Sequence, residues 1–227
     1  MPIPDGIVGT GTLASWNGKT TGELAVIAKA GHFTFVLSHF STDYTGQNIF
    51  VLADKPFPMS ACGENNLWQI GLADPDPDAG LRPTMNFALP NDGGEWDDPT
   101  FFTTFAFIQY PSGSIIRGCQ QPIVAATAIH WSTTTIYPTL SPRDRGPRAG
   151  ARGTVATKNG RLFTYKTGEG DTWAAIAYRF DLTPAELRYL NPIRHPDAVV
   201  AEAYADQVLN LSPTNRGNSE SRRPGAQ

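Results

Sequence analysis

The sequence is poor in the side chains that build most catalytic and metal centres. Its 227 residues include 2 cysteines and 4 histidines, and the histidines are spread singly along the chain. Two thiols do not make a disulfide framework, and the chain has no HExxH pair and no GxSxG motif, which are signals of many zinc and serine hydrolases. We therefore expect no metal, no cofactor and no catalytic residue.

Charged residues and long apolar runs are scarce as well. Asp, Glu, Lys and Arg make up 17% of the chain, against about 25% in a usual globular protein. The dense basic patches with interleaved aromatic residues that nucleic-acid binding needs are missing. No run reaches the roughly 18 apolar residues of a membrane span, and the opening residues, MPIPDGIVGT, lack the features of a secretory signal. We expect neither a nucleic-acid partner nor a membrane partner.

Residues 7–140 instead alternate short β-branched or aromatic segments with turn residues, in a chain that holds 22 Gly and 19 Pro. Short strands at this spacing predict a mostly-β sandwich or barrel. Residues 23–40 also admit a helix in part, because Leu24, Ile27 and Ala28 satisfy helical spacing. The predicted strands are Ile7–Trp16, Glu23–Ala28, Phe33–Phe40, Asn48–Leu52, Leu67–Leu72, Met85–Leu89, Phe101–Tyr110, Ile115–Gly118, Ile123–His130 and Thr133–Tyr137.

Two features of this half look like ligand sites but fit structural roles better. A dense aromatic stretch is expected in the core of a sheet rather than on a sugar-binding surface. It consists of Phe101, Phe102, Phe105, Phe107 and Tyr110. The run at 74–80 has three Asp at alternate positions, as calcium loops do, but the Gly and Glu that should stand at its sixth and twelfth positions are absent. We expect a surface loop there.

A different pattern fills the C-terminal part. Phe163 and Tyr165 alternate with polar neighbours over residues 161–166, which predicts a strand with one buried face. Asp171 or Thr172 then caps a helix with apolar residues at i, i+3, i+4 and i+7. That apolar face consists of Trp173, Ile176, Ala177 and Phe180.

A second helix and a second strand complete this region. Thr183 and Glu186 form a capping box, with Pro184 at the first helical position between them. The pair Asn191-Pro192 ends that helix, and residues 207–211 (QVLNL) predict a closing strand. The order is strand, helix, helix, strand within about fifty residues.

About ten of these positions agree in order and spacing with one known pattern. They are Tyr165, Gly170-Asp171-Thr172, Ile176-Ala177, Phe180, Leu182, Glu186-Leu187 and Leu190-Asn191-Pro192. The stretch resembles the LysM family, whose pattern runs aromatic, Gly-Asp-Thr-Leu, Ile-Ala, Phe, Val, Glu-Leu, Leu, Asn-Pro. The resemblance implies a small α+β module of βααβ order.

The resemblance also implies a glycan-binding groove between the loop after the first strand and the loop after the second helix. Its ligands would be glycans that contain N-acetylglucosamine, such as peptidoglycan or chitin. Carried over by position, the groove would consist of Gly170, Asp171, Thr172, Trp173, Asn191, Pro192 and Ile193. Three departures stand out: Trp173 replaces an aliphatic residue, Thr167 replaces Val, and the segment 194–205 is longer than usual. This insertion lies near the groove and could turn it towards protein contact.

Together these patterns predict a two-domain chain. Residues 1–140 would form the β domain, 141–160 a Pro/Gly/Arg-rich linker that is extended and mobile, 161–213 the LysM module and 214–227 a flexible tail. Residues 1–140 hold 5 Lys and Arg against 12 Asp and Glu, whereas residues 141–227 hold 13 against 9. The net charges of −7 and +4 can guide assembly or attraction to an anionic polymer.

A wall-glycan module on a chain without a recognised export signal or catalytic cluster favours a structural subunit of a phage tail, in the baseplate or tail-tip region, or of a related contractile injection device. Such a protein would be assembled in the host cytoplasm, reside in the virion, and bind other tail subunits in homo- and hetero-oligomeric contacts. The LysM module would brace the assembly or contact peptidoglycan. An alternative is a glycan-binding protein without a tail role.

A further alternative is a LysM-containing cell-wall hydrolase. A thiol nucleophile needs a neighbouring base, and the available combinations are Cys62 or Cys119 with His130. Neither cysteine begins an apolar helical run, and His130 ends a strand-like segment. The carboxylates of residues 95–98 could serve a glycosidase only at a separation that sequence does not give. We favour a protein that is not an enzyme.

Overall fold

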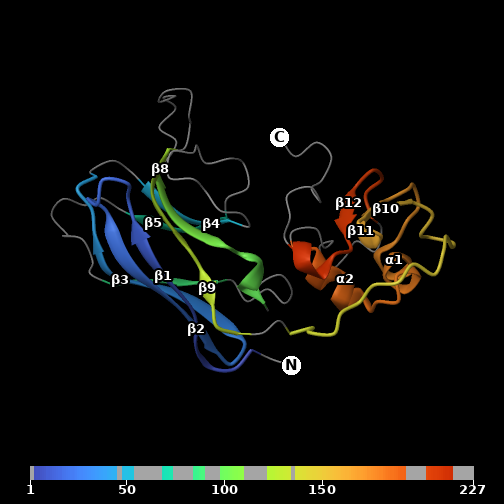
Figure 1. The fold of residues 1–227 in the computed structure, drawn as a ribbon, viewed down its shortest axis with the longest axis horizontal. Coiled ribbons are helices and arrows are strands. Elements are labelled where there is room, and N and C mark those ends of the chain that lie inside the picture. Colours follow the sequence, from blue (N-terminus) through green and yellow to red (C-terminus); the bar gives the residue numbers. More distant parts are fainter. Residues whose placement is uncertain are drawn as a thin grey trace. The chain divides into compact units, whose positions relative to one another are not determined.

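The chain folds into two compact units in a computed structural model that describes residues 3–44, 48–53, 68–73, 84–89, 98–109, 122–133, 136–192 and 203–216. The first unit comprises residues 1–91 and 99–135, and the second comprises residues 92–98 and 136–227 (Figure 1). The two-domain organisation is therefore confirmed. Cys62, Cys119, the run at 74–80, the strand expected at 115–118 and Ile193 lie outside the described residues.

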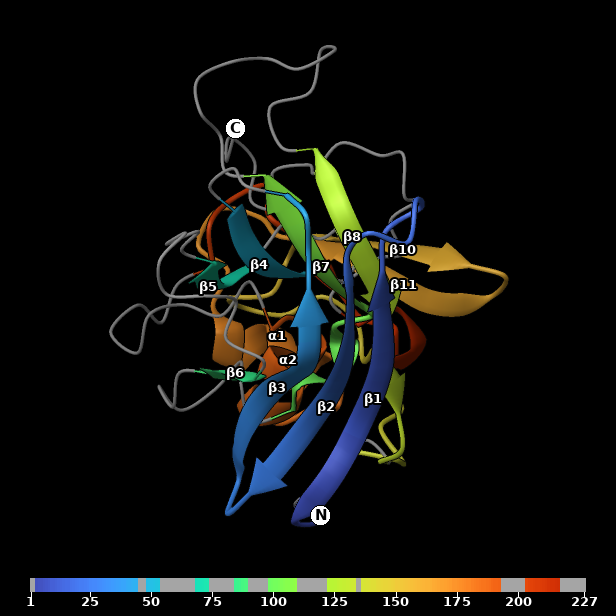
Figure 2. The same ribbon diagram turned by 90° about the vertical axis from the view of Figure 1, so that its left-hand side faces the viewer.

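The first unit is one antiparallel sheet that curls into a nearly closed barrel. Its described strands follow the order β5-β4-β7-β8-β1-β2-β3-β6, and β9 pairs with β1. Figure 2 shows β1, β2 and β3 as three long strands side by side. The strands are β1 (Gly6–Ala14), β2 (Thr21–Lys29), β3 (His32–Ser41), β4 (Asn48–Ala53), β5 (Trp68–Ala73), β6 (Thr84–Ala88), β7 (Thr104–Gln109), β8 (Ile123–Ala128) and β9 (His130–Trp131), with a short 3-10 helix η2 at Pro99–Phe101.

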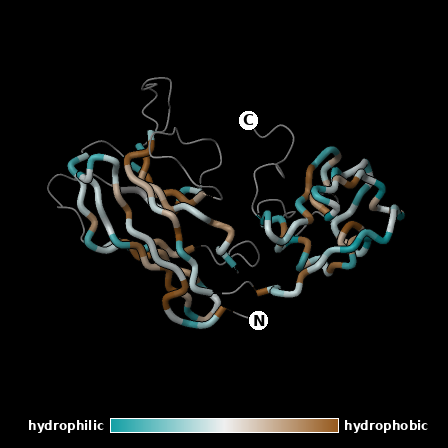
Figure 3. Tube along the Cα trace, in the orientation of Figure 1, coloured by the Kyte–Doolittle hydropathy of each residue, from teal (hydrophilic) through white to brown (hydrophobic). Residues whose placement is uncertain are grey.

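Alternation along β2 and β3 decides the strand over the helix for residues 23–40. Leu24, Val26 and Ala28 are buried while Ile27 between them is exposed, so the period is two and the partial helix is wrong. The turn before β2 forms at Asn17-Gly18, where Gly18 has a φ of +71°. The hydropathy colours change repeatedly along the strands in Figure 3, as this alternation requires.

Phenylalanine side chains fill the barrel. Phe50 stacks on Phe105 and Phe107 with ring centroids 5.6 and 5.0 Å away, and Phe40 meets Phe50 edge-on at 5.5 Å. Phe102, Phe105 and Phe107 are at most 1% exposed, which confirms that the described part of the aromatic stretch is core. Every residue of β4 is buried, so this strand is covered on both faces.

Two strand predictions in this unit need correction. The stretch 101–110 begins with η2, and its strand starts only at Thr104. Of the strand expected at 133–137, the described residues Thr133, Ile136 and Tyr137 lie in no strand. Ile136 instead donates its N–H to the Asp98 carboxylate, at 3.4 Å, which places it in the second unit.

The second unit contains the predicted βααβ order with one more strand in front. Its sheet runs β10-β11-β12 and is antiparallel. Thr172 and Thr183 cap the two helices, and the Thr183–Glu186 capping box is present. Both helices have seven residues, so no described helix is long and apolar enough to cross a membrane. The elements are β10 (Thr154–Lys158), β11 (Arg161–Lys166), α1 (Trp173–Arg179), α2 (Pro184–Leu190), β12 (Val208–Asn210) and a 3-10 turn η3 at Pro213–Asn215.

The segment expected as a mobile linker is part of this unit. Residues 143–153, here called the strap, run along α1: Arg143 and Arg145 donate their N–H groups to the carbonyls of Phe180 and Arg179, each at 2.9 Å. Ala151 is fully buried in the core. The strap has no apolar periodicity because backbone hydrogen bonds, rather than a hydrophobic face, hold it in place.

Candidate functional site

The carboxylate of Asp171 is the centre of the second unit. It is 1% exposed, and it accepts backbone N–H groups from Gly168 at 2.8 Å, Arg152 at 2.8 Å and Gly153 at 3.3 Å. The Tyr165 hydroxyl donates a short hydrogen bond to the same carboxylate. A strand, a loop and the strap therefore converge on one side chain.

These hydrogen bonds keep Asp171 ionised. Burial alone would raise the pKa of its carboxyl, but the Tyr165 hydroxyl and the three backbone donors favour the charged form and bring the pKa below its usual value. Burial, followed by the hydrogen bond to Asp171, raises the pKa of Tyr165 well above its ordinary range. Both groups thus hold fixed charge states near neutral pH.

Arg179 fixes the strap from the other side. Its guanidinium donates to both carboxylate oxygens of Asp144, at 2.8 and 3.1 Å, and to the carbonyls of Ala151 and Gly153, each at 3.0 Å. The hydrogen bonds from Arg179 lower the pKa of Asp144 despite its partial burial. A buried guanidinium with both an ion pair and carbonyl acceptors is well satisfied.

The first side of the expected groove is built from backbone rather than from side chains. Gly170 is exposed with a φ of +72°, which favours glycine. The Thr172 side chain caps α1, and its N–H donates to the Gly150 carbonyl at 2.8 Å. Asp171 is buried, and Trp173, 5% exposed, belongs to the hydrophobic core.

The second side is internal as well. Asn191 is 1% exposed; its amide donates to the carbonyls of Leu187 and Asn210, and its oxygen accepts the N–H of Asn210. Pro192 is buried, and Ile193 lies outside the described residues. Asp171, Trp173 and Asn191 therefore shape the module and offer a ligand no exposed side chain. The assignment of the seven residues to glycan binding stays a prediction.

The structure adds one candidate residue that the sequence did not single out, Tyr204. Ala203 donates its N–H to the Asp171 carbonyl at 2.8 Å, so the end of the long insertion lies against the first loop. The next residue, Tyr204, is 49% exposed. The Thr167 hydroxyl reaches the Tyr204 carbonyl and fixes this segment, which explains Thr where the family pattern has Val.

The described residues that bear on the hydrolase alternative are bound elsewhere or isolated. His130 pairs with Thr10 in the sheet and is exposed. Asp98 is 1% exposed and forms an ion pair with Arg216 at 3.2 Å, so it is not a carboxylate poised in a cleft. In the described ranges no group of three or more His, Cys, Asp or Glu side chains is placed to hold a metal. That the chain is not an enzyme stays a prediction.

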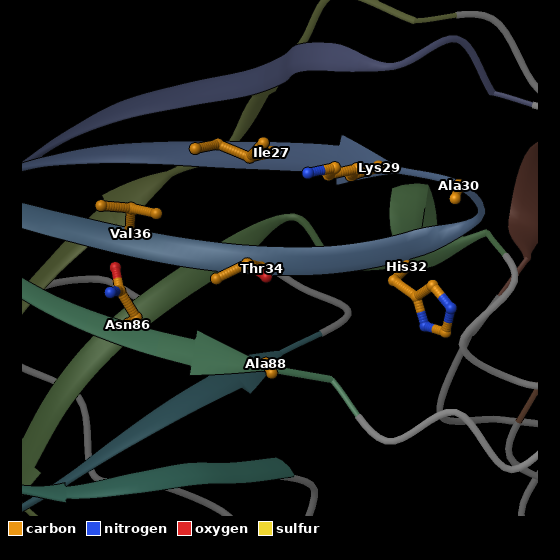
Figure 4. A pocket seen from close by; sticks show the side chains of 8 residues that line it. All are labelled: Ile27, Lys29, Ala30, His32, Thr34, Val36, Asn86 and Ala88. Atoms are coloured by element: carbon orange, nitrogen blue, oxygen red, sulfur yellow. The ribbon is translucent and has the colours of Figure 1, made fainter.

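A separate hollow of about 680 Å³ lies on the outer face of β2, β3 and β6. Its apolar surface comes from Ile27, Val36 and Ala88, and Lys29 and His32 lie beside the β2–β3 turn (Figure 4). The eight lining residues include one imidazole and no carboxylate, so the hollow suits a docking contact better than acid–base chemistry.

Comparison with known proteins identifies the second unit in part. Residues 165–212 match the family model of the LysM domain. No curated protein and no solved structure matches the chain. The match confirms the family resemblance for these residues. A LysM domain indicates glycan binding as the class of function, and peptidoglycan binding is one case of it.

Replacing Asp171 by Asn tests the carboxylate. Because the folded pKa of Asp171 lies below its unfolded value of about 3.9, the ionised group stabilises the folded unit above that pH, and this contribution is lost as the pH falls through the folded pKa. We expect Asp171→Asn to lower the free energy of unfolding by about 1–3 kcal/mol at pH 7 and to flatten its fall below pH ~4. Urea unfolding monitored by the Tyr165 amide signal measures both.

Asp206→Asn is the matched control. Its carboxylate is 68% exposed and pairs with Lys166 at 2.7 Å, so the change should stay within about 1 kcal/mol. Equal stability of Asp171→Asn and the wild-type chain at pH 7 would contradict the role given to Asp171.

Proposed function

Since residues 165–212 form a LysM domain, we propose that the second unit binds N-acetylglucosamine-containing glycan and that peptidoglycan is its ligand. The observation that supports this most directly is a loop, Gly168–Gly170, whose residues Glu169 and Gly170 are exposed beside the half-exposed Tyr204. Asp171 holds both in place: its carboxylate accepts the Gly168 N–H, and its backbone carbonyl accepts the N–H of Ala203, the residue before Tyr204.

The loop has hydrogen-bonding groups to give to a sugar. Within the described ranges, the backbone groups of Glu169 and Gly170 have no hydrogen-bond partner, whereas the N–H of Thr172 and the carbonyl of Asp171 are taken by Gly150 and Ala203. Glycan recognition therefore falls to Glu169 and Gly170. Because the Asp171 hydrogen bonds already order the loop, binding costs little conformational entropy.

Tyr204 supplies the apolar surface that such a site needs. A sugar ring presents a C–H face, and an exposed aromatic ring can cover it while backbone groups orient the hydroxyls. The backbone of Tyr204 is fixed because its carbonyl accepts the Gln207 N–H at 3.2 Å as well as the Thr167 hydroxyl. The insertion thus contributes a wall of the site.

Tyr204→Ala should weaken retention of the full chain on insoluble peptidoglycan about tenfold, which corresponds to roughly 1.4 kcal/mol. The control is Tyr178→Ala, which removes another exposed tyrosine of the same unit, 63% exposed on α1. Sedimentation binding curves compare the variants. Unchanged retention of Tyr204→Ala would remove Tyr204 from the site.

We further propose that the whole chain is a structural subunit of a phage tail, in the baseplate or tail-tip region, or of a related contractile injection device. The supporting observation is the outer face of β1, β2, β3 and β6. Two rows of cross-strand neighbours on this face contain no charged side chain. The rows are Ile7, Ile27, Thr34 and Ala88, and Thr10, Ala25, Val36 and Asn86.

Exposed isoleucines on this face suit contact with a neighbouring subunit. Ile7 is 62% exposed and Ile27 is 36% exposed, and they are direct cross-strand partners. Contiguous apolar surface of this kind marks protein–protein contact sites. In this proposal the first unit docks in the tail of a virion, in homo- or hetero-oligomeric contacts, and the LysM domain reaches peptidoglycan. A glycan-binding protein without a tail role and a cell-wall hydrolase are the alternatives.

Ile27→Lys should leave the chain folded and exclude it from tail particles, because a buried unpaired ammonium in the contact is costly. Thr12→Lys is the control, since Thr12 faces outward opposite Glu23, whose carboxylate can pair with the new ammonium group. The measurement is the ratio of the chain to the other proteins of particles purified by density gradient. Absence of the wild-type chain from such particles would contradict the tail role. Equal incorporation of both variants would show that this face is not the contact with neighbouring subunits.

A further inference from the structure

The strap borders the exposed loop of the glycan site. The Gly150 carbonyl accepts the Thr172 N–H at 2.8 Å, and a Cβ on Gly150 would lie 3.9 Å from the Gly170 carbonyl oxygen. Arg152 donates its N–H to the Asp171 carboxylate at 2.8 Å. Residues 150–153 therefore run beside the loop and form one edge of the surface available to a ligand.

Arg152 is the strap arginine that is both exposed and placed at this edge. Arg145 forms an ion pair with Asp181 at 2.6 Å, and the Arg148 guanidinium stacks over the Tyr178 ring at 3.9 Å. Arg143 lies beyond the other end of α1, where its backbone N–H binds the Phe180 carbonyl. Among the described residues the Arg152 side chain has no ion-pair partner, and its backbone is fixed by Asp171.

We propose that Arg152 binds a carboxylate carried by the glycan, so that the site selects peptide-bearing peptidoglycan over an uncharged N-acetylglucosamine polymer such as chitin. The inference rests on the glycan-binding function proposed above and names the ligand of that same site. A guanidinium presents paired donors that match a carboxylate, and the stem peptides of peptidoglycan end in carboxylates.

The local charges favour a peptide substituent over a dense polyanion. Glu169 lies in the same loop, is exposed, and has no ion-pair partner among the described residues. The edge therefore displays one cation and one carboxylate. A stem peptide carries both an amine and carboxylates, whereas a phosphate-rich polymer would be repelled by Glu169. The contact is exposed and should weaken as salt screens it.

The test measures binding of the full chain to three insoluble polymers: intact peptidoglycan, peptidoglycan stripped of its stem peptides by an amidase, and chitin. Arg152→Gln should lower affinity for intact peptidoglycan about three- to fivefold, the range of an exposed ion pair, and leave the other two affinities unchanged. Arg143→Gln is the matched control, an exposed arginine of the same strap at the far end of α1, and should bind as the wild-type chain does.

Each outcome decides a different point. Equal binding of Arg152→Gln and Arg143→Gln to intact peptidoglycan would overturn the role of Arg152. An equal loss of Arg152→Gln on all three polymers would also overturn it, because the arginine would then act on the sugar or on the fold. Wild-type binding to none of the three would instead overturn the proposed glycan-binding function, and this inference with it.

Discussion

Burying an ionised carboxylate is costly unless hydrogen bonds replace its water, and the second unit is organised to meet that requirement at Asp171. The four donors come from three stretches of chain: the strap, the strand β11 and the loop that follows it. Two of the donors, Arg152 and Gly153, precede residues 165–212. The folded module therefore extends beyond the LysM match, and the strap completes it.

The same requirement positions the candidate site. The carboxylate fixes the loop from Gly168 onward, and the backbone carbonyl of Asp171 also accepts the N–H of Ala203. One residue thus sets the exposed Gly170, the edge formed by Arg152 and the position of Tyr204. The side chains of Asp171 and Asn191 face inward, so the proposed site consists of exposed backbone groups, the Tyr204 ring and the Arg152 side chain.

Local patterns were sufficient wherever the interaction was local. β-Branched and aromatic segments between turn residues predicted β1 to β4, and alternation predicted β11. Cap residues predicted α1 and α2, with the Thr183–Glu186 box observed as expected. The strap was missed because its contacts, which are backbone hydrogen bonds, hydrogen bonds to the Asp171 carboxylate and the Asp144–Arg179 ion pair, are to residues far away in the sequence. The inward orientation of Asp171 and Asn191 was missed for the same reason: a polar residue in a loop pattern does not tell which partners it will find in three dimensions. Tyr204 was missed because it lies in an insertion. Thr167 was a signal that a carbonyl or other acceptor lies nearby, since a hydroxyl in place of Val needs an acceptor.

Native-state hydrogen exchange of the Arg152 and Gly153 amides tests this account most directly. If the Asp171 carboxylate joins the strap and the module into one cooperative unit, these two amides should exchange only through opening of the whole unit, with the same opening free energy as the core amides of Ile176 and Leu209. Exchange of Arg152 and Gly153 through a local opening of much lower free energy, while Ile176 and Leu209 stay protected, would contradict it.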